Sequence, residues 1–172
     1  VVRRFTGRGG PGETPVATEV GLNRFVWNYR MPNAAGLPGL IMWAGSLAGP
    51  RIVPGNYQVR LTIDGKAVGT ESFALKADPR LATTQADFQK QYDFLTKTNQ
   101  KITETHNSIA EIRDLKKQLE DLNGRLKADQ KDLKDLANAI SNKLTAIEEE
   151  LIQTRIRSSQ DALNYPIKLN NK

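Results

Sequence analysis

The sequence contains no cysteine and only one histidine among its 172 residues. The absence of cysteine excludes disulfides, thiolate metal ligands and cysteine nucleophiles. A single histidine gives little support to a Ser-His-Asp device, and a metal site would lack a second imidazole or thiolate. We interpret His106 as a partly solvated packing residue, with metal ligation or proton donation as less favoured alternatives. We therefore expect no catalytic residue, no metal site and no cofactor.

Long apolar runs and catalytic motifs are missing as well. No stretch approaches the roughly 20 apolar residues that a membrane span needs. The chain has no phosphate-binding glycine loop before a helix, no GxSxG elbow and no HExxH pair. A carboxylate pair of the glycosidase type would need a cleft, but Asp64 lies in a predicted turn and Asp78 in a linker. Glu148-Glu149-Glu150 would point in three directions on a helix, which predicts a solvated face. We do not expect an enzyme.

Positive charge is in excess, with 25 Lys and Arg against 19 Asp and Glu. Residues 1–80 hold 10 of these basic residues against 5 acidic ones, and residues 81–172 hold 15 against 14. The excess is spread along the first half without a run of basic residues. Nucleic-acid binding typically needs a clustered basic face, so we do not expect a nucleic-acid partner.

Glycine and proline are concentrated in the first half, where 12 of 13 glycines and seven of eight prolines precede residue 80. This distribution favours short strands and turns over helices. The alternating apolar residues of 57–63, followed by Asp64-Gly65, predict a tight β-hairpin. Further strands are expected before the loop at 9–12 and over 22–30, and residues 39–44 fit a strand or a buried loop. About six strands predict an immunoglobulin-like or fibronectin-like β-sandwich over residues 1–79, with Trp27 in its core.

Residues 80–172 are predicted to form a long antiparallel helical hairpin with a C-terminal tail. Helices are expected over about 84–123 and 127–157. Thr83 or Thr84 is expected to cap the first, with Asp87 in the place of a capping acid, and Gly124 is expected to end it. The predicted seams are apolar at steps of three, four or seven. They comprise Phe88, Tyr92, Leu95, Ile102, Ile109, Ile112, Leu115, Leu119, Leu122 and Leu126, then Leu133, Leu136, Ile140, Leu144, Ile147 and Leu151, with Ile156 as a further candidate.

The two ends of the sequence suggest a piece of a longer protein. The chain starts Val-Val-Arg-Arg without an initiator Met. Near the other end, an apolar pattern resumes with Leu163, Ile167 and Leu169. Pro166 would fit the first turn of a helix there. We expect a third helix that starts or is truncated at the C-terminus.

Several segments in order resemble a known family: GLNRFVWNYRMP, PGLIMWAG, GPRIVPGNYQVRLTIDGK, KADPRLATTQADFQKQYDFL and DALNYPIKLNNK. Together they resemble the C-terminal region of large exported bacterial proteins with BNR/Asp-box, sortilin-like β-propeller repeats. The resemblance implies export to the periplasm, the cell surface or the medium, and a propeller upstream in the same chain. Members are often labelled glycosyl hydrolase from those repeats, but the Asp-box pattern itself is absent here, so no propeller active-site residue carries over.

We expect a non-catalytic accessory region that serves as a scaffold, docking or oligomerisation module. Its expected partners are the upstream propeller and a second copy bound through the helical hairpin. The alternative is a carbohydrate-binding module that supports a glycosidase-like propeller, with aromatic side chains as stacking platforms. Those side chains are Trp27, Tyr29, Trp43 and Tyr57.

Overall fold

The computed structural model describes residues 1–10, 13 and 15–171. These residues form two compact units, each assembled from two stretches of chain. The first unit comprises residues 1–32 and 48–97, and the second comprises residues 33–47 and 98–172. The long helix α1, Gln85–Arg125, contributes to both.

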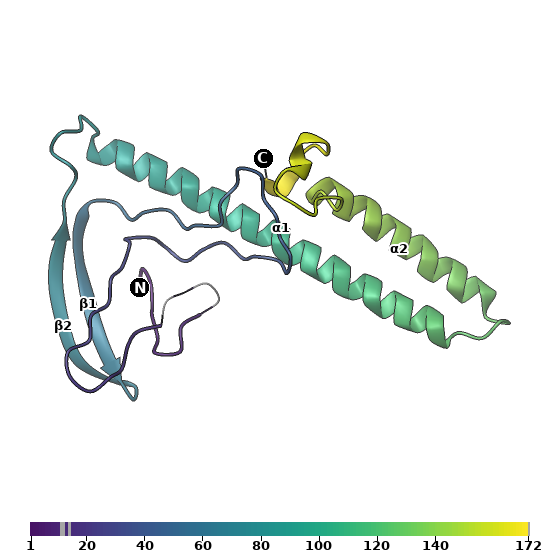
Figure 1. Ribbon diagram of the computed structural model, residues 1–172, viewed down its shortest axis with the longest axis horizontal. Coiled ribbons are helices and arrows are strands. Elements are labelled where there is room, and N and C mark those ends of the chain that lie inside the picture. Colours follow the sequence, from purple (N-terminus) through teal and green to yellow (C-terminus); the bar gives the residue numbers. More distant parts are fainter. Residues whose placement is uncertain (11–12, 14, 172) are drawn as a thin grey trace. The chain divides into compact units, whose positions relative to one another are not determined.

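The first unit contains one two-stranded antiparallel sheet, made of β1 (Gly55–Ile63) and β2 (Lys66–Leu75) (Figure 1). Asp64 and Gly65 join the strands with positive φ angles of 49° and 78°, as the Asp-Gly sequence predicts. The register places Tyr57 opposite Phe73, and their rings stack with centroids 5.8 Å apart. The tight hairpin predicted at this position is confirmed.

The predicted β-sandwich is wrong, because these two strands are the only ones in the described residues. Residues 22–30 and 39–44 form no strand, and the segment before the loop at 9–12 forms none either; Pro11 and Gly12 lie outside the described residues. A single bridge joins Arg30 to Arg51. The apolar residues around Trp27 instead form a local cluster of rings. Phe5 lies 4.7 Å from Phe25 and 6.4 Å from Trp27, whose ring lies 5.5 Å from Tyr29.

An arginine anchors the irregular backbone of the first unit. The Arg3 guanidinium donates hydrogen bonds of 2.9 Å to the carbonyl oxygens of Arg30 and Met31, and one of 2.7 Å to the Glu13 carboxylate. The Arg30 guanidinium in turn donates to the Gly49 carbonyl at 2.8 Å. These contacts supply the backbone partners that a sheet would otherwise provide.

Helix α1 begins with the predicted capping residues. The Asp87 carboxylate accepts hydrogen bonds from the Thr84 backbone N–H (3.0 Å) and hydroxyl (2.7 Å), while the Asp87 N–H donates to the Thr84 hydroxyl at 3.2 Å. The Thr84 hydroxyl and backbone N–H hold the pKa of Asp87 below its ordinary value. Gly124 does not end the helix, which continues through Arg125, so that part of the prediction is wrong.

Helix α2, Lys131–Leu151, runs back beside the C-terminal part of α1 (Figure 1). The predicted long hairpin and third helix are wrong. Helix α1 has 41 residues and α2 has 21, ending six residues before the predicted position 157. In the place of a third helix, the described tail has two single 3-10 turns, Asp161–Leu163 and Leu169–Asn171.

The core of the second unit lies where three segments meet. Leu37, Ile109 and Ile152 are buried against one another, with Leu40 and Leu151 packed around them. Ile109 is fully inaccessible to solvent. The loop at 33–47, the middle of α1 and the end of α2 are therefore held together by a small apolar cluster.

Candidate functional site

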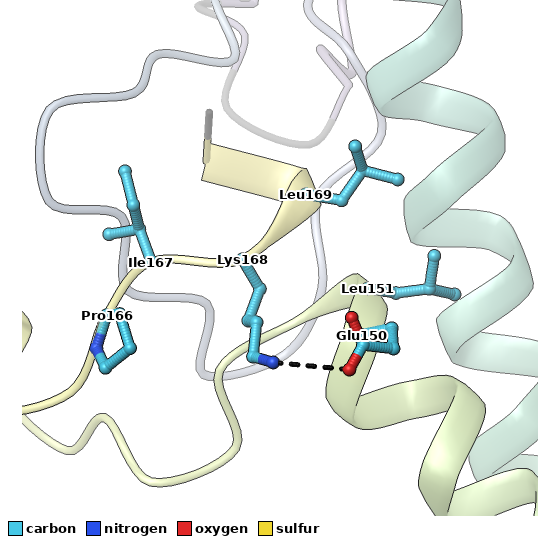
Figure 2. A pocket seen from close by; sticks show the side chains of 6 residues that line it. All are labelled: Glu150, Leu151, Pro166, Ile167, Lys168 and Leu169. Carbon is cyan, nitrogen blue, oxygen red and sulfur yellow. Dashed lines mark ion pairs between the residues drawn. The ribbon is translucent and has the colours of Figure 1, made fainter.

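A shallow apolar hollow lies between the end of α2 and the C-terminal tail (Figure 2). It is lined by Glu150, Leu151, Pro166, Ile167, Lys168 and Leu169. The Lys168 ammonium reaches across to the Glu150 carboxylate at 3.6 Å, and the Glu150 side chain is 81% exposed. An exposed pair of this kind contributes little free energy, and its charges compensate each other.

The single histidine is fully buried, which corrects the expectation of a partly solvated residue. Its Nδ1 lies 2.5 Å from the Ala35 carbonyl oxygen, and its Nε2 lies 3.4 Å from Nδ2 of Asn170. Because a carbonyl oxygen only accepts, Nδ1 carries the proton, and Nε2 then accepts from the Asn170 amide. Thr103 supports the same loop, since its hydroxyl accepts the Ala35 N–H at 3.1 Å. His106 therefore ties the loop at 33–47 and the tail to α1.

Within the described part of the chain, no group of three or more His, Asp or Glu side chains gathers as potential metal ligands. His106 uses both ring nitrogens in contacts within the unit. Asp64 lies in the hairpin turn, and Asp78 pairs with Arg80 at 2.6 Å. These carboxylates are occupied with turn formation and a local ion pair.

Glu148 forms a buried ion pair that joins the two helices, which corrects the prediction that its whole acidic run is solvated. The residue is 5% exposed. Arg113 Nε donates to Glu148 Oε1 at 2.7 Å, and Lys116 Nζ donates to Oε2 at 3.0 Å. Burial raises the pKa of Glu148, but the hydrogen bonds and charges of Arg113 and Lys116 outweigh burial and leave the pKa below its ordinary value. The carboxylate stays ionised and serves as a link between the helices.

The predicted apolar seams of α1 and α2 close only in part: Ile109 and Ile112 are buried, and Leu119, Leu144 and Leu151 are half-buried. Seven of their residues remain between 39% and 58% exposed. Six of these belong to the second unit, and we call this set the apolar face: Leu115, Leu122, Leu133, Leu136, Ile140 and Ile147. Each of the six immediately precedes a buried or half-buried residue. Those following residues are polar or small and are less exposed than the apolar face: Lys116, Asn123, Lys134, Ala137, Ser141 and Glu148.

The apolar face is continuous across both helices. Contacts between Arg113 and Glu148, and between Asn123 and Asn138 at 2.9 Å, show that the helices run antiparallel. One residue corresponds to a rotation of about 100° on an α-helix. On each helix, a residue of the apolar face stands one position before an inner residue. Because the two helices are antiparallel, this step turns the apolar side chains of both helices toward the same side of the pair. The register then places Leu122 level with Ile140.

The opposite side of the helix pair is polar. On α1 it carries Lys117 and Glu120, and on α2 it carries Asn142 and Glu149, all of which are exposed. The pair is therefore an amphipathic layer with one apolar and one polar side, rather than a hairpin with a closed seam. Sequence reasoning found the apolar stripe but missed this surface. The sequence signal for this surface was a second stripe, made of the small and polar residues that stand one position after each residue of the apolar face.

Of the four aromatic residues weighed as sugar platforms, three belong to the first unit and Trp43 belongs to the second. Trp27 and Tyr29 adjoin each other within the first unit, and the Trp27 indole donates to the Arg30 carbonyl at 3.0 Å. Tyr57 stacks on Phe73, and its hydroxyl donates to the Val53 carbonyl at 2.7 Å. Trp43 belongs to the second unit and is 44% exposed. Trp27 and Tyr57 have the neighbours expected of packing residues.

Neither the sequence nor the structure matches any known protein family, curated protein or solved structure with which it was compared. Within the described residues, no helix is both long enough and apolar enough to cross a membrane.

Proposed function

We propose that this chain is a non-catalytic interaction module, and that the apolar face is the surface through which it assembles. The observation that carries this proposal is that six leucines and isoleucines of α1 and α2 remain exposed, while the polar or small residue that follows each of them is buried or half-buried. Large contiguous apolar patches on protein surfaces commonly mark interaction sites. A helix pair with one apolar side fits a partner that offers a second helical layer.

The resemblance to exported propeller proteins supplies the setting of this proposal. In that setting the chain is the accessory region of a larger exported bacterial protein, and a β-propeller precedes it. The propeller is one candidate occupant of the apolar face and a second copy of the chain is the other. The charges at the edges of the face favour a second copy.

Carbohydrate binding is not proposed as a second function. Stacking on a sugar requires an aromatic ring with an open face and polar groups around it. The Tyr57 ring is stacked on Phe73, and the Trp27 ring lies between Phe5 and Tyr29. No observation places these rings and Trp43 on one surface.

Photo-crosslinking tests the proposed function in the whole protein. A photoreactive amino acid would replace Ile140 in the apolar face, and a matched control would replace Asn142, which is exposed on the polar side. We expect position 140 to crosslink to a defined peptide, mapped by mass spectrometry, and position 142 to give no such product. Equal crosslinking at both positions, or none at either, would contradict the proposal.

A further inference from the structure

We infer that a second copy of this chain covers the apolar face, with a two-fold axis that runs parallel to the helices. This inference rests on the proposed function and names its partner. In this arrangement α1 of each copy lies on α2 of the other, and four helices surround one apolar interior. The half-buried Leu119 and Leu144 form the floor of each face, and the six exposed residues become buried.

The charges at the outer edges of the face select this arrangement. A two-fold rotation about an axis parallel to the helices does not shift any residue along the helix axis. Residues that lie at the same height, or level, in one copy therefore lie at that level in the other copy as well. The outer edge of α1 in one copy then meets the outer edge of α2 in the other. On the register set by the Asn123–Asn138 and Arg113–Glu148 contacts, Lys143 of one copy is level with Gln118 of the other. Gln118 donates to the Asp114 carboxylate at 2.7 Å, which places that carboxylate about one turn, or roughly 6 Å, from the level of Lys143.

A second opposite pair meets further along the same edge. Arg125, the last residue of α1, is level with position 136 of α2. Asp132 lies one turn away from that level, in the first turn of α2. Arg125 of one copy and Asp132 of the other therefore meet as opposite charges, and the symmetry repeats both pairs on the other edge.

One pair of like charges also meets in this arrangement, and a nearby lysine reduces the repulsion. Glu111 and Glu150 share a level at the open end of the helix pair. The Lys168 ammonium lies 3.6 Å from Glu150 and offsets its negative charge. The edge contacts thus comprise two attractive pairs and one repulsion that Lys168 reduces. These contacts decide the relative orientation of the copies, while apolar burial supplies the affinity.

Size-exclusion chromatography with light scattering over a concentration series tests the inference on the 172-residue chain. We expect a concentration-dependent dimer. Ile140→Ser should weaken it, while the matched Ala139→Ser, at an exposed neighbouring position, should leave it unchanged. Lys143→Glu should weaken the dimer about tenfold by placing like charges at the edge. Lys117→Glu, which makes the same change on the polar side, should have no effect.

Paired charge reversals test the two-fold arrangement of the copies separately from the use of the apolar face. Combining Asp114→Lys with Lys143→Glu should restore the affinity that Lys143→Glu loses. If the wild-type dimer is weakened by Ile140→Ser but the charge variants have no effect, the two-fold arrangement is overturned and the proposed function stands. A chain that stays monomeric at every concentration overturns the second copy as partner. Crosslinking from position 140 to an upstream propeller would then retain the proposed function alone.

Discussion

Replacing Glu148 by Gln removes the buried charge that joins α1 to α2 and preserves the shape of the side chain. Glu148 is 5% exposed and accepts one hydrogen bond from Arg113 and one from Lys116. Hydrogen bonds to charged groups contribute about 1.5–3 kcal/mol each. The Arg113 and Lys116 side chains are 41% and 29% exposed, so solvent screens them and recovers part of the loss. We expect Glu148→Gln to lower the free energy of unfolding by about 2 kcal/mol at pH 7.

Thermal unfolding followed by circular dichroism at the helix band measures this loss. For a unit of about 90 residues, 1 kcal/mol corresponds to a Tm shift of roughly 4–8 °C. Glu149→Gln is the matched control, since it makes the same change at the adjacent exposed position and should leave Tm within about 2 °C.

The pH dependence identifies the cause of the loss. Because the pKa of Glu148 is lowered in the folded chain, its stabilisation is complete above the unfolded value of about 4.3 and is lost as pH falls through the lower folded value. The difference in Tm between wild type and Glu148→Gln should therefore be full at pH 6–7 and shrink below about pH 4. A difference that persists unchanged at pH 3, or no difference at pH 7, would refute the reasoning.

Three further substitutions test other parts of the fold. Ile109→Ala should destabilise the second unit by about 3 kcal/mol, because Ile109 is fully buried, and urea unfolding would show it; a change below 1 kcal/mol would contradict the assigned core. His106→Leu leaves the Ala35 carbonyl and the Asn170 amide without their ring partner, and limited proteolysis should cleave the loop at 33–47 faster than in wild type. Gly65→Ala should destabilise the β-hairpin by about 1 kcal/mol through its φ of 78° alone, since no atom would contact the added methyl group, and hydrogen exchange of the strand amides measures it.

Features set by neighbours in sequence could be predicted. The alternation over 57–63 and the Asp-Gly turn specify a hairpin whose partners lie within some 20 residues of each other. Thr84 and Asp87, which lie within four residues of each other, specify the start of a helix. The sandwich prediction failed because it required strands far apart in sequence to pair. The aromatic residues at 25, 27 and 29 find partners in their own cluster and in Phe5 instead. Local pattern does not reveal which long-range partner a segment will have.

The rotation of the helices about their own axes could not be predicted from the sequence either. Periodicity identified the leucines and isoleucines that share a side of each helix, but not whether the neighbouring helix covers that side. In the structure, Ala137 and Ser141 face inward, and the Glu148 ion pair lies between the helices. A rotation of one residue turns the apolar stripe from a predicted seam into a surface. The exposure of the apolar face could therefore be found only from the packed structure.

Thiol labelling at two single cysteines tests the central claim most directly, because the chain has no cysteine of its own. Ala137→Cys probes an inner position that is 3% exposed, and Ile140→Cys probes the apolar face, where the native side chain is 40% exposed. At low protein concentration, position 140 should react with a maleimide much faster than position 137. As concentration rises, position 140 should become protected as a second copy covers it. Equal rates at low concentration would contradict the packing of the helices, and a rate at position 140 that does not change with concentration would contradict the association of two copies.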